Sequence, residues 1–307
     1  MQHSYGLQDI HIQNAWLTIC SYDGVHLGHQ QIINQVTAGA FASGAPAVVL
    51  TFYPHPMVVL RGPRESFYLT LPEEKAEILG GMGVDLVVTH TFNKDVAAME
   101  PEEFIRKLQS HLGFTHLYVG YDFALGHNRK GDVPYLTRLG EQLGYQVHTV
   151  EAFELDGAPV SSSRVRRALD TGDVAEANRL LGREFRLMGT VIPGDGRGKQ
   201  IGVPTANLEI SLEQAVPGPG VYACQVTWEG KRYPAVTNIG VRPTFEDAPV
   251  APRVETHVLD FEHDLYGQQI GLEFTAFLRP ERKFDGIESL VAQIRADIEK
   301  GREILEG

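Results

Sequence analysis

The chain has 307 residues, enough for two domains of ordinary size. Hydrophobic residues make up 43% and charged residues 21%, which is a globular composition and excludes a disordered chain. The formal net charge is −12, and no basic stretch resembles a nucleic-acid footprint, so we expect no general nucleic-acid partner. The apolar runs are too short to span a bilayer, so we expect no membrane. Two distant cysteines, Cys20 and Cys224, and the lack of a signal-peptide pattern indicate a reduced cytoplasmic protein.

Strand and helix patterns alternate through the first half of the chain. The strands are expected at 15–20, 45–52, 84–89, 117–120 and 145–150. The helices are expected at 30–42, 73–79, 101–112 and 133–143. In the first helix the apolar spacing includes Ile33, Val36, Ala40 and Phe41. This order predicts an α/β domain with a parallel sheet and right-handed crossovers.

The stretch 22–29, Tyr-Asp-Gly-Val-His-Leu-Gly-His, lies where the first expected strand gives way to the first expected helix. Ligands of open α/β sheets bind there, outside the carboxyl ends of the strands. Gly24 and Gly28 let the backbone approach a ligand, and the helix start offers free N–H groups to an anion. His26 and His29 add donors without a permanent positive charge. The stretch predicts a phosphate cradle; a tight turn with solvated imidazoles is the alternative.

Two later strand ends also carry unusual residues. His55 stands between two prolines that fix a rigid turn, although Pro-X-Pro is often only a loop brace. Asp122 and Phe123 follow the fourth expected strand, and capping a turn or helix is the commoner role of such an Asp.

A second candidate anion site is predicted at 160–167, Val-Ser-Ser-Ser-Arg-Val-Arg-Arg. Serines ahead of a run with helical apolar spacing are typical N-caps. Hydroxyls of Ser162 and Ser163, free N–H groups, and Arg164 and Arg166 would then converge on one helix start, which suits an anion. An ordinary capped helix with solvent-exposed arginines is the alternative.

The pattern changes after a short helical run at 172–181 that ends at Gly182. Short alternating strands separated by Gly and Pro turns follow, which predicts an antiparallel barrel. These strands are expected at 188–192, 221–228, 253–261 and 270–278, and a C-terminal helix at 287–305. In that helix Leu290, Ile294, Ile298 and Leu305 form part of the apolar face.

A glycine-rich loop with Arg and Lys lies in this second half, at 194–202. Such a loop can wrap phosphates through backbone N–H groups, but taken alone it is more often a hairpin turn. Further on, Glu255 stands in an expected strand, where a lone Glu is usually a solvated outer-face residue.

Several of these motifs resemble one family, in collinear order over nearly the whole chain. The segment 26–29, H-L-G-H after D-G-V, is similar to the H-x-G-H signature of the adenylyltransferase superfamily. The longer string resembles the N-terminal module of bacterial bifunctional riboflavin kinase/FAD synthetases. The segments 120–126 and 160–166 resemble the family's G-x-[D/N]-F-x-[F/L]-G and I-S-S-T-x-I-R motifs. The segment 204–207, P-T-A-N, resembles the signature of riboflavin kinases.

The resemblance implies an α/β plus β fold in two domains. Residues 1–183 would form a Rossmann-like nucleotidyltransferase domain with a parallel sheet, the FMN adenylyltransferase. Residues 184–307 would form an antiparallel β-barrel riboflavin kinase domain with a terminal helix.

The resemblance also implies roles for individual residues. The catalytic residues would be His26, His29, Arg166 and Glu255, the last as the base for the ribityl 5′-hydroxyl. Nucleotide and flavin would be bound in the first domain by Asp23, Gly24, Gly28, His55, Asp122, Phe123, Ser162, Ser163 and Arg164. In the kinase domain they would be bound by Gly194, Gly196, Gly198, Lys199, Asn238 and Arg242. Thr205 and Asn207 would present hard oxygens to Mg²⁺ held with ATP phosphates.

The implied activity is the phosphorylation of riboflavin to FMN by ATP, followed by adenylylation of FMN to FAD and pyrophosphate. Mg²⁺ is the expected cofactor, small molecules are the expected partners, and flavin apoproteins are expected recipients of FAD. Two residues depart from the family: Cys20 replaces a frequent Gly, and Tyr53 replaces the Asp of T-F-D-P-H-P. The alternatives are therefore a single retained activity with an impaired adenylyl site, or a non-catalytic flavin or nucleotide sensor.

Overall fold

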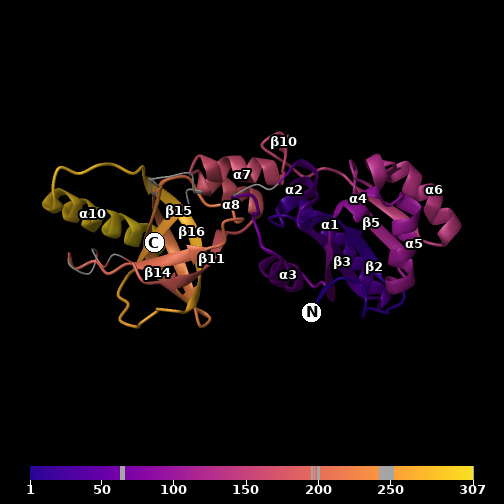
Figure 1. Cartoon of the computed structure of the whole chain (residues 1–307), viewed down its shortest axis with the longest axis horizontal. Helices are drawn as coiled ribbons and strands as arrows, with labels where there is room; N and C mark the ends of the chain where they lie inside the picture. Colours follow the sequence, from indigo (N-terminus) through magenta and orange to yellow (C-terminus); the bar gives the residue numbers. More distant parts are fainter. Residues whose placement is uncertain (63–65, 195, 197, 199–200, 242–251, 307) are drawn as a thin grey trace. The chain divides into compact units, whose positions relative to one another are not determined.

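The computed structural model describes residues 1–62, 66–194, 196, 198, 201–241 and 252–306 (Figure 1). Lys199 and Arg242, both expected in the kinase site, lie outside these described residues. By contacts the chain divides into two compact units, 1–64 with 69–162, and 65–68 with 163–307. The domain boundary expected between residues 183 and 184 stays a prediction.

A six-stranded sheet forms the centre of the first unit, in the order β1-β4-β3-β2-β5-β8. All five strand pairs are parallel, which confirms the parallel sheet. Its strands are β1 (Gln2–Tyr5), β2 (Trp16–Ile19), β3 (Ala47–Tyr53), β4 (Leu86–Thr91), β5 (His116–Gly120) and β8 (Gln146–Val150). The edge strand β1 was not expected, because its sequence Q-H-S-Y has little strand character and only pairing with β4 makes it a strand.

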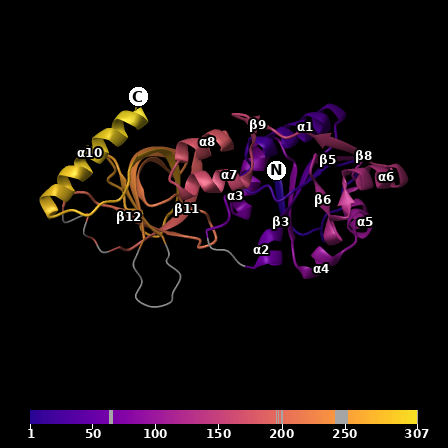
Figure 2. The same ribbon diagram turned by 90° about the horizontal axis from the view of Figure 1, so that it is seen from above.

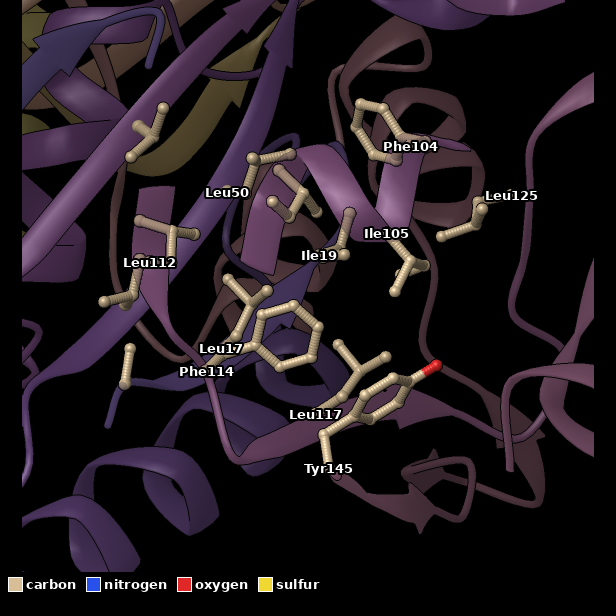
Figure 3. Packing of buried hydrophobic residues seen from close by; sticks show 14 of the residues in the cluster. Leu17, Ile19, Leu50, Phe104, Ile105, Leu112, Phe114, Leu117, Leu125 and Tyr145 are labelled. Atoms are coloured by element: carbon tan, nitrogen blue, oxygen red, sulfur yellow. The ribbon is translucent and has the colours of Figure 1, made fainter. Parts of the chain in front are cut away.

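Helices cover both faces of this sheet. They are α1 (Leu27–Ser43), α2 (Pro56–Arg61), α3 (Pro72–Gly81), α4 (Lys94–Ala98), α5 (Pro101–Leu112) and α6 (Val133–Leu143). Apolar side chains of α5 and α6 pack on one face, in the core that Figure 3 shows around Leu17, Phe104 and Leu117. Buried side chains of α1 and α3 pack on the other face. Phe41 does not belong to this core, since it is 90% exposed at the last turn of α1.

Short elements follow β5 and β8 along the chain. They are β6 (Ala124–Leu125), the 3₁₀ turn η1 (His127–Arg129), β7 (Gly131–Asp132), β9 (Glu154–Leu155), β10 (Ala158–Pro159), α7 (Ser162–Asp170) and α8 (Val174–Leu181). The contact division places α7 beyond Ser162, and all of α8, in the second unit. There α8 packs on the barrel, and Asn178 Nδ2 donates to the Phe274 carbonyl at 2.7 Å.

The second unit contains a closed antiparallel barrel in the order β11-β12-β15-β14-β13-β16, which confirms the expected barrel. Its strands are β11 (Phe185–Ile192), β12 (Ala206–Ile210), β13 (Gly220–Trp228), β14 (Lys231–Val241), β15 (Pro252–Val258) and β16 (Gln269–Arg279). The terminal helix α10 (Ile287–Glu306) contacts β13, β14 and β16 on the outside of the barrel (Figure 2).

Three details of the barrel differ from expectation. Strands β12 and β14 were not expected, and the strand expected to reach residue 261 ends at Val258. In β14, Pro234 and Gly240 interrupt the strand pattern, and both residue types usually argue against a strand interior. The long pairing of β14 with β13 and β15 overrides that local preference.

Candidate active sites

The 20–29 turn lies at the topological switch point of the parallel sheet. Strand β2, which precedes the turn, pairs with β3 on one side and with β5 on the other. The chain leaves β2 through α1 toward β3, so the carboxyl ends of β2 and β5 flank the position where the strand order reverses. In doubly wound sheets ligands bind in this crevice. The fold therefore places the predicted phosphate cradle where a nucleotide is expected.

The backbone of this turn is strained. Tyr22 has φ 46°, Gly24 has φ 83° and Val25 has φ 41°. Glycine adopts such values freely, but for a β-branched residue like Val25 they cost free energy on the order of 1–3 kcal/mol. Strain of this kind persists only where the surrounding structure holds the backbone in place, and it is concentrated at ligand sites.

Specific hydrogen bonds hold the turn. Asp23 is 1% exposed, and its Oδ1 accepts from the backbone N–H of Leu69 at 2.9 Å and of Thr70 at 3.3 Å. Thr70 Oγ1 accepts from the Gly24 N–H at 3.1 Å, and Ser162 Oγ donates to the Asp23 carbonyl at 2.8 Å. Asp23 and Ser162, both predicted as ligand-binding residues, thus have structural partners within the first unit.

The two histidines stack on one another at the start of α1. Their ring centroids are 3.6 Å apart with 18° between the planes. His26 is the N-cap of α1, and its Nδ1 accepts from the His29 N–H at 3.4 Å. A Cβ added at Gly28 would lie 3.3 Å from the His26 ring, so the glycine leaves room for the stack.

His29 has an electrostatic environment that keeps it neutral. Burial, and then the nearby His26 and Lys75, hold the pKa of His29 well below its usual value. Its Nδ1 is buried and has no hydrogen-bond partner among the described residues. A buried polar atom without a partner is uncommon in native structures, and here it lies in the predicted phosphate cradle.

Two residues next to this turn, Lys75 and Cys20, were not predicted as site residues. Lys75 of α3 is 3% exposed, and its Nζ donates to the Ser21 carbonyl at 2.7 Å and to Thr51 Oγ1 at 3.3 Å. In the sequence, Lys75 follows two acidic residues of an amphipathic helix and is indistinguishable from a solvated residue. Cys20 Sγ lies 3.9 Å from His29 Nε2.

Other predicted residues of the first unit lie at neighbouring strand ends. His55 follows β3 and caps α2, its Nδ1 accepting from the Met57 N–H at 3.0 Å. Asp122 and Phe123 follow β5 in a turn closed by the Phe123 N–H and the Gly120 carbonyl at 3.1 Å. Because β3 and β5 both pair with β2, these residues and the 20–29 turn occupy the same edge of the sheet.

Residues of α7 have partners within the second unit. Arg164 Nη2 lies 2.6 Å from Glu176 Oε1 in an ion pair. Arg166 Nε donates to the Phe67 carbonyl at 2.7 Å, and its guanidinium lies 4.0 Å from the centre of the Phe67 ring. The helix α7 begins at Ser162, and Ser163 follows in its first turn, so the predicted start of this helix is confirmed. The phosphate-binding roles of Ser163, Arg164 and Arg166 stay predictions.

Three of the predicted kinase residues, Asn207, Glu255 and Asn238, meet in one row across the barrel wall. Glu255 of β15 lies directly opposite Asn207 of β12 on one side and Asn238 of β14 on the other. The row continues through Val221 of β13 to Arg279 of β16. Directly opposite residues point to the same face of a sheet, so these side chains share one surface.

This surface borders a cavity of about 370 Å³ on the outside of the barrel. Its polar lining includes every residue of the row except Val221, together with Thr205, Gly196 and Gly198 of the predicted site. Its apolar lining includes Val221 and Val236 of the strands and Leu290, Ile294 and Ile298 of α10. The cavity thus lies between the polar row of the barrel and a mainly apolar face of α10, which also carries Asp297.

Two glycines of the 194–202 segment, Gly194 and Gly198, lie tightly against the two proposed metal ligands. A Cβ at Gly194 would come 2.0 Å from Asn207 Nδ2, and one at Gly198 would come 3.2 Å from Thr205 Oγ1. Only glycine allows the loop backbone so close to these side chains. Arg253, two residues along β15, forms an ion pair with Glu255.

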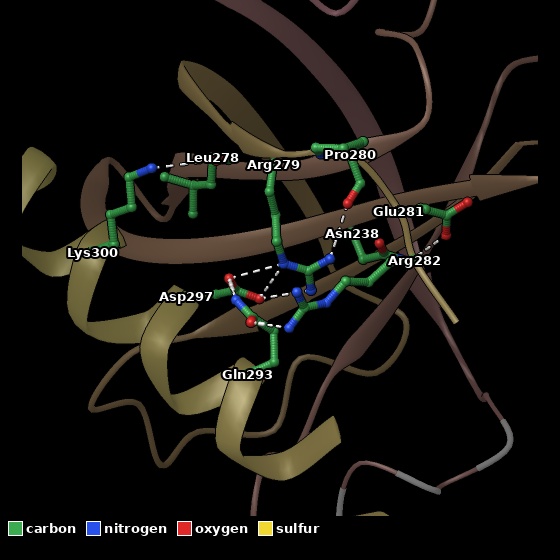
Figure 4. A network of polar contacts seen from close by, with 9 residues as sticks. All are labelled: Asn238, Leu278, Arg279, Pro280, Glu281, Arg282, Gln293, Asp297 and Lys300. Carbon is green, nitrogen blue, oxygen red and sulfur yellow. Dashed lines mark hydrogen bonds and ion pairs between the residues drawn. The ribbon is translucent and has the colours of Figure 1, made fainter. Parts of the chain in front are cut away.

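A buried ion pair joins α10 to the wall of the cavity. Arg279 donates from Nε to both oxygens of Asp297 at 3.0 Å and from Nη2 to Oδ2 at 2.8 Å (Figure 4). Gln293 adds a hydrogen bond to Asp297 Oδ1 at 2.7 Å. Neither Arg279 nor Asp297 was predicted, although an Asp between Ile294 and Ile298 on the apolar face of α10 was a signal for a buried partner.

Comparison with known proteins gives matches over both units. The chain matches the family model of FAD synthetase over residues 9–164 and that of riboflavin kinase over residues 181–305. A bifunctional riboflavin kinase/FMN adenylyltransferase of Pseudomonas fluorescens is 40% identical over 286 residues, 93% of this chain and 91% of the relative. One of Listeria monocytogenes is 36% identical over 285 residues, 92% of this chain and 90% of the relative.

A solved structure shares the whole fold. A crystal structure described as a macrolide-efflux protein from Streptococcus pneumoniae has 28% identity and a TM-score of 0.89, covering 98% of each chain. Among the described residues of the present chain, no helix is both long and apolar enough to cross a membrane.

The parallel sheet with its switch-point turn and the barrel with its polar row define a two-module transferase. The chain belongs to the family of bifunctional riboflavin kinase/FMN adenylyltransferases.

Proposed function

We propose that the chain phosphorylates riboflavin to FMN and then adenylylates FMN to FAD, releasing pyrophosphate. The observation that carries the proposal is the row of Asn207, Glu255 and Asn238 on a cavity between barrel and helix. The match of both modules to their family models supports the second activity alongside the first.

In the kinase module, Glu255 acts as the base that takes the proton of the ribityl 5′-hydroxyl. It borders the cavity, where its carboxylate can accept a proton from a bound hydroxyl, and it forms an ion pair with Arg253. The flavin ring occupies the cavity, where the apolar side chains of α10 and the strands suit a planar ring system and the polar row suits its ribityl chain.

Thr205 and Asn207 hold Mg²⁺ together with ATP phosphates in this proposal. The residues fit the ion, since both present hard oxygens and the glycine loop that would wrap the phosphates lies against them. When bound, Mg²⁺ neutralises charge on the phosphates during transfer.

In the adenylyltransferase module, His26 and His29 donate to the α-phosphoryl group of ATP. The FMN phosphate is already ionised at neutral pH, so the reaction needs positioned donors more than a strong base. The unpartnered Nδ1 of His29 and the helix start behind it supply such donors. Ser163, Arg164 and Arg166 bind phosphate in this proposal, on the strength of the family motif.

We further propose that the protein acts in the cytoplasm, binds small molecules and no nucleic acid, and passes FAD to flavin apoproteins. The test of the two activities is direct. Purified protein is incubated with riboflavin, ATP and Mg²⁺, and FMN and FAD are separated by chromatography over time. Appearance of FMN followed by FAD supports both activities; FMN alone would indicate an adenylyl site impaired by Cys20 and Tyr53, and neither product would indicate a sensor.

A further inference from the structure

A buried lysine, Lys75, contacts the backbone of the switch-point turn. Lys75 is 3% exposed, and its ammonium bonds to the Ser21 carbonyl and to Thr51 Oγ1. Ser21 follows β2 and Thr51 lies near the end of β3, so the ammonium joins two neighbouring strand ends at the ligand edge of the sheet. An ammonium group can donate three hydrogen bonds. Among the described residues, Lys75 donates two, to the Ser21 carbonyl and to Thr51 Oγ1.

A merely structural role does not account for a charge in this place. Burying an ammonium costs several kcal/mol unless it is paired and fully hydrogen-bonded. The carboxylate that acts on Lys75 is that of Asp23, whose Oδ1 already accepts from two backbone amides. Both acceptors that Lys75 does have are neutral, so part of its charge remains available to an anion at the turn.

We propose that Lys75 is a positioning residue for adenylyl transfer: its ammonium fixes the shape of the 21–25 turn through Ser21 and provides a resident positive charge beside His29. This inference rests on the proposed function, in that it takes the 20–29 turn to be the adenylyl site. The strained φ values of Tyr22 and Val25 need such an anchor, because an unheld turn would relax toward ordinary backbone angles.

The charge has a second consequence, for the protonation of His29. The titratable groups that face or act on this ring are His26, which stacks on it, Tyr22, whose ring packs edge-on against it at 5.0 Å, Lys75, and the Cys20 thiol near Nε2. Burial holds the pKa of His29 low, and the nearby His26 and Lys75 lower it further. Removing the charge of Lys75 therefore raises the pKa of His29, so that the ring takes up a proton at a higher pH.

The test uses the full chain with Lys75→Met and Lys75→Gln, and Lys107→Met, an exposed lysine of the same unit, as the matched control. Glutamine keeps an N–H donor for Ser21 but has no charge. We expect kcat for FAD formation from supplied FMN to fall about 100-fold in Lys75→Met, with KM changed little, and to recover only partly in Lys75→Gln. FMN formation should be unchanged in all three, because it belongs to the other module, and unchanged NMR signals of the first unit's histidines outside the turn show that this unit is folded.

The titration of His29 separates this inference from the proposed function. Its ring signal in NMR spectra of histidine-labelled protein is assigned by its loss in His29→Gln. In the wild type it should not titrate near its ordinary value of about 6.5, whereas both Lys75 variants should move the midpoint upward and Lys107→Met should not. Wild-type titration near the ordinary value, or full FAD formation by folded Lys75→Met, overturns the inference. Absence of FAD formation in the wild type overturns the proposed function. In that case the His29 titration alone decides whether the charge of Lys75 acts on the turn.

Discussion

Glu255 and Asn207 are direct cross-strand partners of β15 and β12, and both side chains line the same cavity. This pairing places the proposed base beside a proposed metal ligand. Replacing Glu255 with Gln keeps the shape of the side chain but removes the carboxylate that would accept the proton. A general base contributes about 10²–10⁴-fold to a rate, so FMN formation should fall by that order.

The Glu255→Gln measurement is paired. Kinase turnover is measured at saturating riboflavin and ATP, and ligand affinity is measured by calorimetry, which should change little. FAD formation from supplied FMN should persist. Glu229→Gln, in an exposed turn between β13 and β14, is the matched control. Retained turnover in Glu255→Gln, or loss explained wholly by weaker ATP binding, would contradict the role of a base.

Gly194→Ala should weaken the kinase by displacing Asn207, a proposed metal ligand. The added Cβ would lie 2.0 Å from Asn207 Nδ2, so the amide must move or the loop must shift. We expect a raised KM for Mg-ATP, as for variants of Thr205 and Asn207 themselves, because a lost metal contact weakens nucleotide binding. Gly286→Ala is the control, since a Cβ there meets nothing within 4 Å. Equal kinetics in the two variants would argue against metal binding by Asn207.

His26→Ala and His29→Ala should abolish most FAD formation and leave FMN formation intact. Losing one positioned donor costs about 10²–10³-fold in rate. His26 also caps α1, so its replacement by Ala removes a cap worth about 0.5–2 kcal/mol of stability. His26→Asn restores a cap but not the imidazole, and it separates the two effects. If His26→Asn forms FAD at a near-normal rate, the ring acts only as a cap.

A fragment that starts at Glu184 should fold alone and phosphorylate riboflavin, and one that starts at Ser163 should be more stable. The longer fragment retains α8, in which Val174, Leu180 and Leu181 are fully buried. Burial of three such side chains contributes on the order of 5 kcal/mol. Urea unfolding followed by circular dichroism compares the two. A folded fragment from Glu184 without FMN formation would argue against the domain assignment, and equal stability would show that α8 adds nothing to the barrel.

The first unit should lose stability on mild acidification. His116 Nδ1 and His148 Nε2 share one hydrogen bond of 2.9 Å between β5 and β8. Burial lowers the pKa of both rings, and His116 lowers the pKa of His148 further. Because the unfolded chain then binds more protons, the stabilisation is present above about pH 6.5 and is lost as the pH falls below it.

The measurement is the urea midpoint of the first unit at about pH 7.5 and about pH 5.5. The midpoint should be lower at the acid pH, and the double variant His116→Phe, His148→Phe should show a smaller difference. His11→Gln, an exposed histidine, should behave like the wild type. An acid midpoint equal to or above the neutral one would contradict the prediction.

Local signals were enough to predict several elements and part of one site. The helices expected at 101–112 and 133–143 have these bounds in the structure, where a proline opens each first turn and a glycine in the left-handed region ends each helix. The 20–29 turn was predictable for the same reason: its glycines and histidines are neighbours in the chain, so their composition alone indicates an anion site at a strand-to-helix junction.

Strand pairing was decided only by the tertiary structure. Strands β1 and β14 have weak local patterns and exist because distant strands accept and donate their hydrogen bonds. The row of Asn207, Glu255 and Asn238 depends on the register between three strands, which no segment contains by itself. The contact of Lys75 with the turn and the Arg279–Asp297 ion pair could not be predicted from the sequence for the same reason. A charged side chain has the same local pattern whether it faces water or a partner far along the chain, and only the packing of the elements decides between them.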